Sequence, residues 1–176
     1  MLKYLLFLNT RSFMDSYKRI LKASLGLFAE FGFHGTSIRK IANEAKVSLG
    51  LTYNYFGSKE DLFKEVILQN YKYLTTGFAG LKQLKGKKRI SKLETLVLAN
   101  AIKNREVLTI LNAAQYHNDV RQLLPIDLGN FYDQLKSEIE IAYDTGKEKA
   151  TPKSVELTLA TIVGLIDLRL RFTSFV

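Results

Sequence analysis

Residues 35–59 read GTSIRKIANEAKVSLGLTYNYFGSK, and this stretch decides the fold. Apolar residues recur at helical spacing in 38–45 and again in 49–56, with a break of three residues between the two segments. Thr36 and Ser48 stand where a hydroxyl would cap each helix. Two short helices joined by three or four residues have helix-turn-helix spacing. The stretch therefore predicts a helix-turn-helix.

The flanking residues complete a small helical head. An apolar stripe over 16–31 predicts a first helix, and Gly32 and Gly35 follow it with the conformational freedom that a helix end requires. Gly57 ends the third helix, and Ser58 is placed to cap a long fourth one with acidic residues in its first turn.

The rest of the chain keeps helical periodicity and lacks strand-like alternation, so the sequence predicts an all-α fold. The last helix is expected to begin at Thr151 and Pro152, a cap followed by proline at the first helical position. Its apolar residues surround the helix, which indicates that it is covered on all sides. A second subunit is the preferred cover, with Gly164 allowing close approach; burial in a monomer is the alternative.

Composition narrows the class of function. The formal net charge is +9, from 26 Lys and Arg against 17 Asp and Glu, and the excess lies in residues 1–60 and in 82–89. This placement suggests an N-terminal region that binds a polyanion. The alternative is that the positive charges only keep the protein soluble. The chain has no Cys, two His and no recognisable catalytic motif, so we expect no enzyme activity, cofactor or metal site.

The N-terminus resembles the start of a signal peptide, but its apolar core is short and no small-residue cleavage site follows. No run approaches the roughly 20 apolar residues of a membrane span. We therefore expect a cytoplasmic protein without a membrane partner. Residues 1–13 are interpreted as an arm, or as an extension upstream of a natural start at Met14.

The motifs of residues 20–66 together resemble the DNA-binding domain of TetR/AcrR-type transcriptional regulators. They are LFAEFGF at 27–33, GTSIRKIA at 35–42, VSLG at 47–50, YNYF at 53–56 and SKE at 58–60. The resemblance implies an N-terminal three-helix helix-turn-helix DNA-binding head plus a C-terminal helical ligand-binding and dimerisation domain. The expected division is 1–13 for the arm, 14–60 for the head and 61–176 for the helical domain.

The same resemblance implies a function. A homodimer formed through the last two helices would place its third helices in the major groove of a palindromic double-stranded DNA operator. A small-molecule effector would release this repressor from DNA. The alternative from the residues alone is a helical protein-interaction or membrane-surface module built on the apolar N-terminus and the basic segment.

Candidate DNA-binding residues follow from matched positions and from the predicted outer face of the third helix. Phosphate contacts are expected from Ser37, Lys40, Tyr53, Tyr55 and Lys59. Arg39 is expected to reach a base edge. On the third helix Ser48, Leu49, Gly50 and Asn54 are expected to face outward, with Leu49 at a thymine methyl and Asn54 at an adenine or a phosphate. For Arg39 the competing interpretation is a salt bridge to Glu44 or Asp15.

Some positions depart from the family pattern or remain weakly defined. Lys46 occupies a turn position that usually holds Gly, and Thr52 replaces a larger aliphatic residue that normally seats the third helix. The basic segment 82–89 is expected to be a solvated loop. Polar residues that interrupt the C-terminal apolar stripes are candidates for effector binding: Asn112, Tyr116 and Tyr132.

Overall fold

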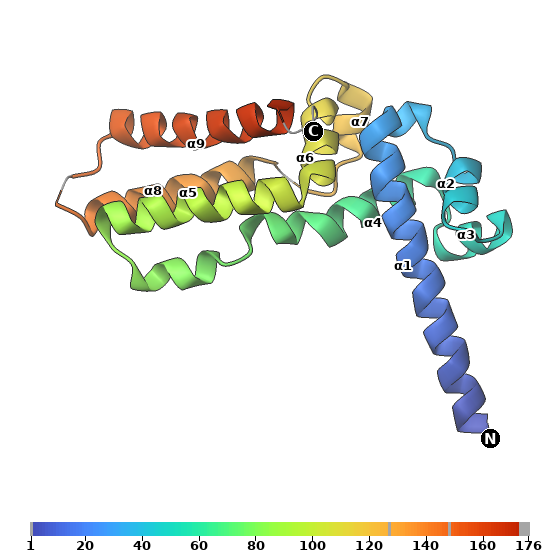
Figure 1. Cartoon of the computed structure of the whole chain (residues 1–176). Helices are drawn as coiled ribbons and strands as arrows, with labels where there is room; N and C mark the ends of the chain where they lie inside the picture. Colours follow the sequence, from blue (N-terminus) through green and yellow to red (C-terminus); the bar gives the residue numbers. More distant parts are fainter. Residues whose placement is uncertain (1, 127, 148, 173–176) are drawn as a thin grey trace. The chain divides into compact units, whose positions relative to one another are not determined.

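The computed structural model describes residues 2–126, 128–147 and 149–172, with side chains at 13–126, 129–147 and 149–168 (Figure 1). Every regular element in these ranges is helical, which confirms the all-α prediction. The α-helices are α1 (Leu2–Gly35), α2 (Ile38–Glu44), α3 (Leu49–Tyr55), α4 (Lys59–Tyr71), α5 (Gly86–Lys103), α6 (Arg105–Ala114), α7 (Asn118–Gln122), α8 (Leu128–Asp144) and α9 (Pro152–Phe172). Two 3₁₀ helices, η1 (Lys72–Thr75) and η2 (Phe78–Gln83), lie between α4 and α5.

The chain forms two compact units. The first contains residues 1–69 and 106–125, and the second contains 70–105 and 126–176. The first unit thus includes a later segment, α6 and α7, beside the N-terminal helices. The sequence suggested a DNA-binding head at 14–60 and a helical domain at 61–176. These ranges divide the chain by expected function and not by compactness, so they remain a proposal.

The first helix is longer than its apolar stripe. Its backbone is helical from Leu2, so residues 2–13 continue the helix that the pattern predicted from Ser16. At the other end Gly32 has a φ of 70°, a left-handed conformation that glycine adopts without a Cβ penalty. The predicted end of the regular helix near Gly32 is therefore confirmed.

The caps of α2 and α3 are set by two serines. The Lys40 amide donates to the Ser37 hydroxyl at 3.2 Å, and the Leu51 amide donates to the Ser48 hydroxyl at 3.1 Å. The prediction that Thr36 caps α2 is wrong. Thr36 is buried and donates instead to the carbonyls of Leu27 and Gly32, at 3.0 and 2.8 Å, so its hydroxyl closes the end of α1.

Aromatic packing forms the centre of the first unit. Phe28 and Phe63 are almost fully buried, and their rings meet edge to face at 5.1 Å. Phe33 packs against Phe63 in a similar way, also at 5.1 Å. Ile20 and Ile41 are fully buried in the same unit. This core joins α1, α2 and α4 and so supports the helix-turn-helix from behind.

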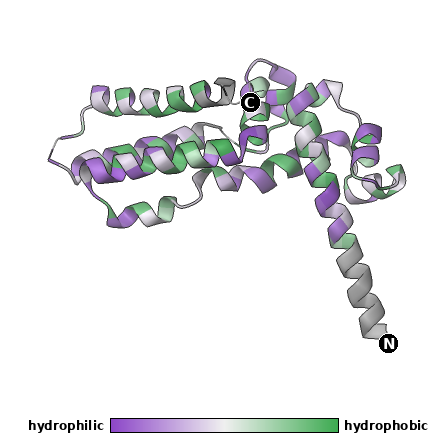
Figure 2. Cartoon of the chain, in the orientation of Figure 1, coloured by the Kyte–Doolittle hydropathy of each residue, from purple (hydrophilic) through white to green (hydrophobic). Residues whose placement is uncertain are grey.

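The second unit is built on three long helices. α5, α8 and α9 all pack on one another, and η1 and η2 pack on α5. Leu93 of α5, Leu135 and Ile139 of α8 and Ile162 of α9 are essentially inaccessible to solvent. Hydrophobic and hydrophilic residues alternate along these helices in Figure 2, as expected for helices with one buried face.

The prediction of a solvated loop over 82–89 is wrong for its second half. Gly86 begins α5, and Arg89 is only 4% exposed. Its Nε donates to Glu138 Oε2 at 3.0 Å, and its Nη1 donates to the Leu81 and Leu84 carbonyls at 2.8 and 3.3 Å. Arg89 is therefore a buried bridge between η2, α5 and α8.

The last helix does not have a uniform surface. Thr151 caps it, since the Ser154 amide donates to the Thr151 hydroxyl at 3.1 Å, and α9 begins at Pro152 as predicted. Ile162 is buried, whereas Leu157 and Leu168 are 68% and 52% exposed. The second unit thus covers one side of α9 and leaves an apolar side open.

Candidate nucleic-acid interface

The packing of α3 against the rest of the first unit determines which of its side chains are exposed to solvent. Thr52 is fully buried and donates to the Ser48 carbonyl at 3.2 Å, so a small polar residue fills the position without an unpaired hydroxyl. The exposed residues of α3 form one outer face: Leu49, Gly50, Tyr53 and Asn54. An added Cβ at Gly50 would meet no atom within 4 Å, so the backbone is open to close approach.

The second helix adds exposed cationic groups beside this face. Arg39 and Lys40 are both exposed. Lys40 Nζ donates to the Gly35 carbonyl at 3.2 Å and lies 4.9 Å from the centre of the Phe31 ring. Asp15, one alternative partner considered for Arg39, forms its ion pair with Arg19 at 3.2 Å. Arg39 is exposed, and its contact with a base stays a prediction.

Two of the predicted phosphate contacts are engaged within the head. The Tyr55 hydroxyl donates to the Phe13 carbonyl at 2.6 Å, and the two rings lie 4.4 Å apart. Lys59 Nζ donates to the carbonyls of Phe33 and Thr36 at 2.9 and 3.1 Å. An ammonium group has three donors, so Lys59 keeps one for another acceptor. Tyr55 would have to release Phe13 before donating elsewhere.

Sequence reasoning missed Arg19, which holds the turn between α2 and α3. Its Nη1 donates to the carbonyls of Ala45 and Lys46 at 3.0 and 3.2 Å. Its Nη2 donates to the Ser16 hydroxyl at 3.2 Å. Arg19 lies outside the apolar stripe of the first helix, and nothing in the local sequence indicates a contact with Ala45, 26 residues away. This role is therefore seen only in the fold.

Lys46 occupies this turn with a φ of 54°. A left-handed backbone conformation costs an L-residue other than Asn roughly 1–2 kcal/mol. Glycine avoids this strain in the folded state, but it also increases the conformational entropy of the unfolded chain, which offsets part of the gain. We expect Lys46→Gly to raise the free energy of unfolding by about 0.5–1 kcal/mol in urea denaturation. Lys46→Ala removes the same charge and keeps the strain, so it should not be stabilising; an equal gain in both variants would contradict this explanation.

A second link crosses from α1 to α4. Tyr17 donates to Glu65 Oε1 at 2.6 Å and stacks on Phe56 at 5.4 Å between ring centres. Burial, together with the hydrogen bond to the Glu65 carboxylate and its charge, raises the pKa of Tyr17 from 10.0 to about 12. The pair ties the start of the head to the helix that follows α3.

The raised pKa of Tyr17 predicts a loss of stability in alkali. Between about pH 10 and 12 the unfolded chain loses the phenolic proton while the folded chain retains it, so unfolding becomes more favourable as the pH rises. Urea denaturation across this range should show a steeper fall for the wild type than for Tyr17→Phe. Tyr116→Phe, at an 86% exposed position, serves as the control and should behave like the wild type.

The three effector candidates belong to different units of the chain. Tyr116 is 86% exposed, and Asn112 is also exposed. Both belong to the first compact unit, whereas Tyr132 is half-buried on α8 in the second.

The described residues contain no group of three or more His, Cys, Asp or Glu placed to hold a metal ion. None of the described helices has the length and hydropathy of a membrane span.

Known bacterial regulators are similar to part of this chain. The model of the family described as "Bacterial regulatory proteins, tetR family" matches residues 20–66. HTH-type transcriptional regulator HbdR of Aromatoleum sp. (strain CIB) is 52% identical over 44 residues, which make up 25% of this chain and 19% of HbdR. HTH-type transcriptional regulator RutR of Escherichia coli (strain K12) is 43% identical over 61 residues, 35% of this chain and 29% of RutR. The matches thus span under a third of each relative.

Solved structures extend the likeness beyond the head. An HlyIIR mutant protein with residues 169–186 of HlyIIR replaced by a linker has a TM-score of 0.70 at 25% identity, covering 93% of this chain and 89% of that one. FadR from Bacillus subtilis, solved in complex with stearoyl-CoA, has a TM-score of 0.67 at 21% identity over 88% of this chain and 84% of FadR. The second likeness is one of fold alone.

A helix-turn-helix head followed by a helical domain defines the class of helix-turn-helix regulators, the class to which these relatives belong. Within that class, residues 20–66 match the tetR family model, and the fold is similar to that of the HlyIIR mutant protein over 93% of this chain. The head, residues 20–66, is therefore similar to the DNA-binding part of the TetR family of bacterial regulatory proteins.

Proposed function

We propose that the chain is a DNA-binding transcriptional regulator, a repressor that reads its operator with α3. The outer face of that helix carries the proposal: Leu49, Gly50, Tyr53 and Asn54 are exposed together on a helix that Thr52 and the Ser48 cap hold against the head. The 52% identity to HbdR over 44 residues supports the same use. An exposed apolar Leu49 suits a thymine methyl, and Asn54 suits an adenine edge.

Arg39 and the hydroxyl groups supply the remaining contacts. A bidentate pair between Arg39 and guanine contributes about 1–3 kcal/mol of discrimination between bases. Ser37 and Ser48 accept cap hydrogen bonds, which leaves their hydroxyl hydrogens for phosphate oxygens. Tyr53, Lys40 and the third donor of Lys59 complete the proposed phosphate contacts, and Tyr55 joins them only when it leaves Phe13.

The regulator is proposed to act as a homodimer through α8 and α9. Leu157, Ala160, Gly164 and Leu168 are exposed at spacings of three and four residues, which places an apolar stripe along one side of α9. Ile141 of α8 is 39% exposed as well. A paired copy would cover this stripe and present two α3 helices to the halves of a palindromic operator.

A small-molecule effector that binds the helical domain and releases DNA is part of the same proposal. Support comes from FadR of Bacillus subtilis, a regulator of this fold solved in complex with stearoyl-CoA. Asn112, Tyr116 and Tyr132 remain candidates for effector contacts. We propose that the protein works in the cytoplasm, where its operator lies, and without enzyme activity of its own.

Fluorescence anisotropy on the DNA upstream of its own gene tests the proposal, with scrambled DNA as the comparison and a salt series for each. Tight, salt-sensitive binding with two protomers per site and a preference for the upstream DNA is expected. Arg39→Ala should weaken specific binding about 5- to 150-fold and leave scrambled DNA nearly unaffected. If the full chain binds no DNA fragment selectively in a genome-wide selection, the proposal is wrong.

A further inference from the structure

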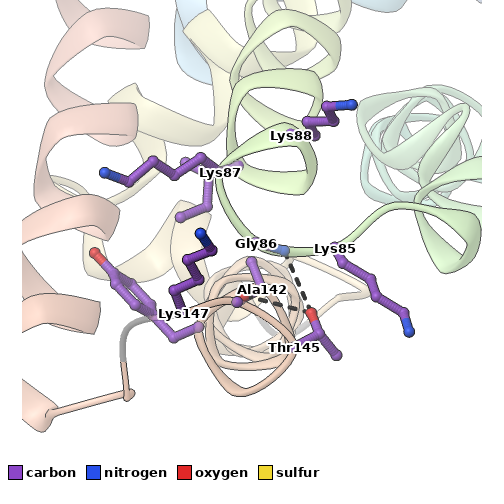
Figure 3. A pocket seen from close by; sticks show the side chains of 10 residues that line it. Lys85, Gly86, Lys87, Lys88, Ala142, Thr145 and Lys147 are labelled. Atoms are coloured by element: carbon purple, nitrogen blue, oxygen red, sulfur yellow. Dashed lines mark hydrogen bonds between the residues drawn. The ribbon is translucent and has the colours of Figure 1, made fainter.

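A cavity of about 520 Å³ lies in the second unit, where the start of α5 meets the turn that follows α8 (Figure 3). Gly86 and Gly146 bring the two segments together, because a Cβ added to Gly86 would lie 3.2 Å from the Gly146 Cα. The Gly86 amide also donates to the Thr145 hydroxyl at 3.4 Å. The volume is within the range of small-molecule sites.

Four of the residues that line this cavity are lysines, and none of the described lining residues is acidic. They are Lys85, Lys87, Lys88 and Lys147. In Figure 3 the side chains of Lys87 and Lys147 extend on one side of the cavity, whereas Lys85 and Lys88 extend away from them. Because the described lining contains lysines and no carboxylates, the electrostatic potential at the cavity is positive.

The helix that starts here increases the positive potential. α5 is 18 residues long, its N-cap Lys85 makes no side-chain cap hydrogen bond, and its first turn holds no acidic residue. Lysines in this position oppose the helix dipole, whose N-terminal end favours an anion. Lysines at the positive end of a helix dipole are unfavourable for helix stability, and residues that are unfavourable for stability are more typical of a binding site than of a purely structural turn.

The inner wall of the cavity is apolar. Ile90 and Tyr143 are half-buried and Ala142 is fully buried, and all three line the cavity. The Tyr143 hydroxyl is hydrogen-bonded with Thr158 at 3.0 Å, which fixes its ring as part of the wall. The site therefore offers cations at its rim and a hydrocarbon surface inside.

We propose that this cavity binds an organic phosphate. Its phosphate group would lie on the side of the cavity that carries Lys87 and Lys147, and its apolar or aromatic body would pack on Ile90, Ala142 and Tyr143. A phosphate monoester carries nearly two negative charges at neutral pH, which suits a cluster of ammonium groups better than a single carboxylate. The inference is independent of the DNA-binding proposal, since binding is measured without DNA.

Isothermal titration of the full chain with 1-naphthyl phosphate and octyl phosphate tests the site, with 1-naphthol and octanol as neutral comparators. We expect saturable binding of at least one phosphate, at least tenfold tighter than its neutral comparator. The double variant Lys87→Gln/Lys147→Gln should weaken it at least tenfold, while Lys92→Gln, on the same helix and outside the cavity lining, should bind like the wild type. Circular dichroism checks that each variant is folded.

Three results would overturn the inference: no saturable binding of either phosphate, equal affinity for a phosphate and its neutral comparator, or unchanged affinity in the folded double variant. Flotation with phosphatidylglycerol vesicles distinguishes the source of the phosphate. Binding to these vesicles without binding of the soluble phosphates would mean that the lysines form a membrane contact, and the cavity would not be the site proposed.

Discussion

Arg89→Ala should lower the free energy of unfolding by about 3–5 kcal/mol, because it leaves the partly buried Glu138 carboxylate without its cation. The Arg89 side chain is 5% exposed and that of Glu138 is 16% exposed, so water replaces little of the lost interaction. The carbonyls of Leu81 and Leu84 lose their donor at the same time. Urea denaturation followed by circular dichroism measures the change, and a loss this large is a substantial part of the roughly 5–15 kcal/mol by which a typical domain is stable.

Lys88→Ala is the matched control, since it removes an exposed cation from the neighbouring position of α5. It should change stability by less than about 0.5 kcal/mol. The double variant Arg89→Met/Glu138→Gln removes both charges and should recover part of the loss. Similar stability of Arg89→Ala and Lys88→Ala would show that the bridge to α8 is not the structural link described here.

Leu157→Asp should separate the proposed dimer and reduce operator affinity by about 10²–10⁴-fold, because two linked heads gain that factor over one. The side chain is 68% exposed within one subunit, so the substitution should leave the helical domain folded. Analytical ultracentrifugation measures the oligomeric state, and anisotropy on the selected operator measures the affinity.

Ile102→Asp provides the control for this prediction. Ile102 is an apolar residue of α5 that is 47% exposed, so its substitution adds the same charge to the same unit outside the apolar stripe of α9. It should leave both dimerisation and operator affinity unchanged. A Leu157→Asp protein that remains dimeric, or an Ile102→Asp protein that dissociates, would place the interface elsewhere.

Local sequence signals predicted most of the helical head. The serine caps of α3 and α4 and the end of α1 near Gly32 were predictable because capping and left-handed glycine depend on neighbouring residues only. Thr36 shows the limit: two adjacent hydroxyl residues fit a cap equally well, and burial of Thr36 against α1 decides for Ser37.

Long-range partners were not predictable. Arg89 looked like one more cation in a basic segment, and only the packing of α5 on α8 places Glu138 beside it. The engagement of Tyr55 with Phe13 likewise depends on two residues 42 positions apart. Periodicity reports which face of a helix is apolar, but not which element covers it, and α9 illustrates this with one covered side and one open side.

Selection of genomic DNA fragments by the purified protein, followed by sequencing, tests the central claim most directly. The account predicts one enriched inverted repeat whose half-site centres lie about one helical turn, or a multiple of it, apart. Arg39→Ala and Asn54→Ala should each relax the preference at defined base pairs of both half-sites. Fragments recovered without a common motif, or an identical motif in both variants, would contradict sequence reading by this helix-turn-helix.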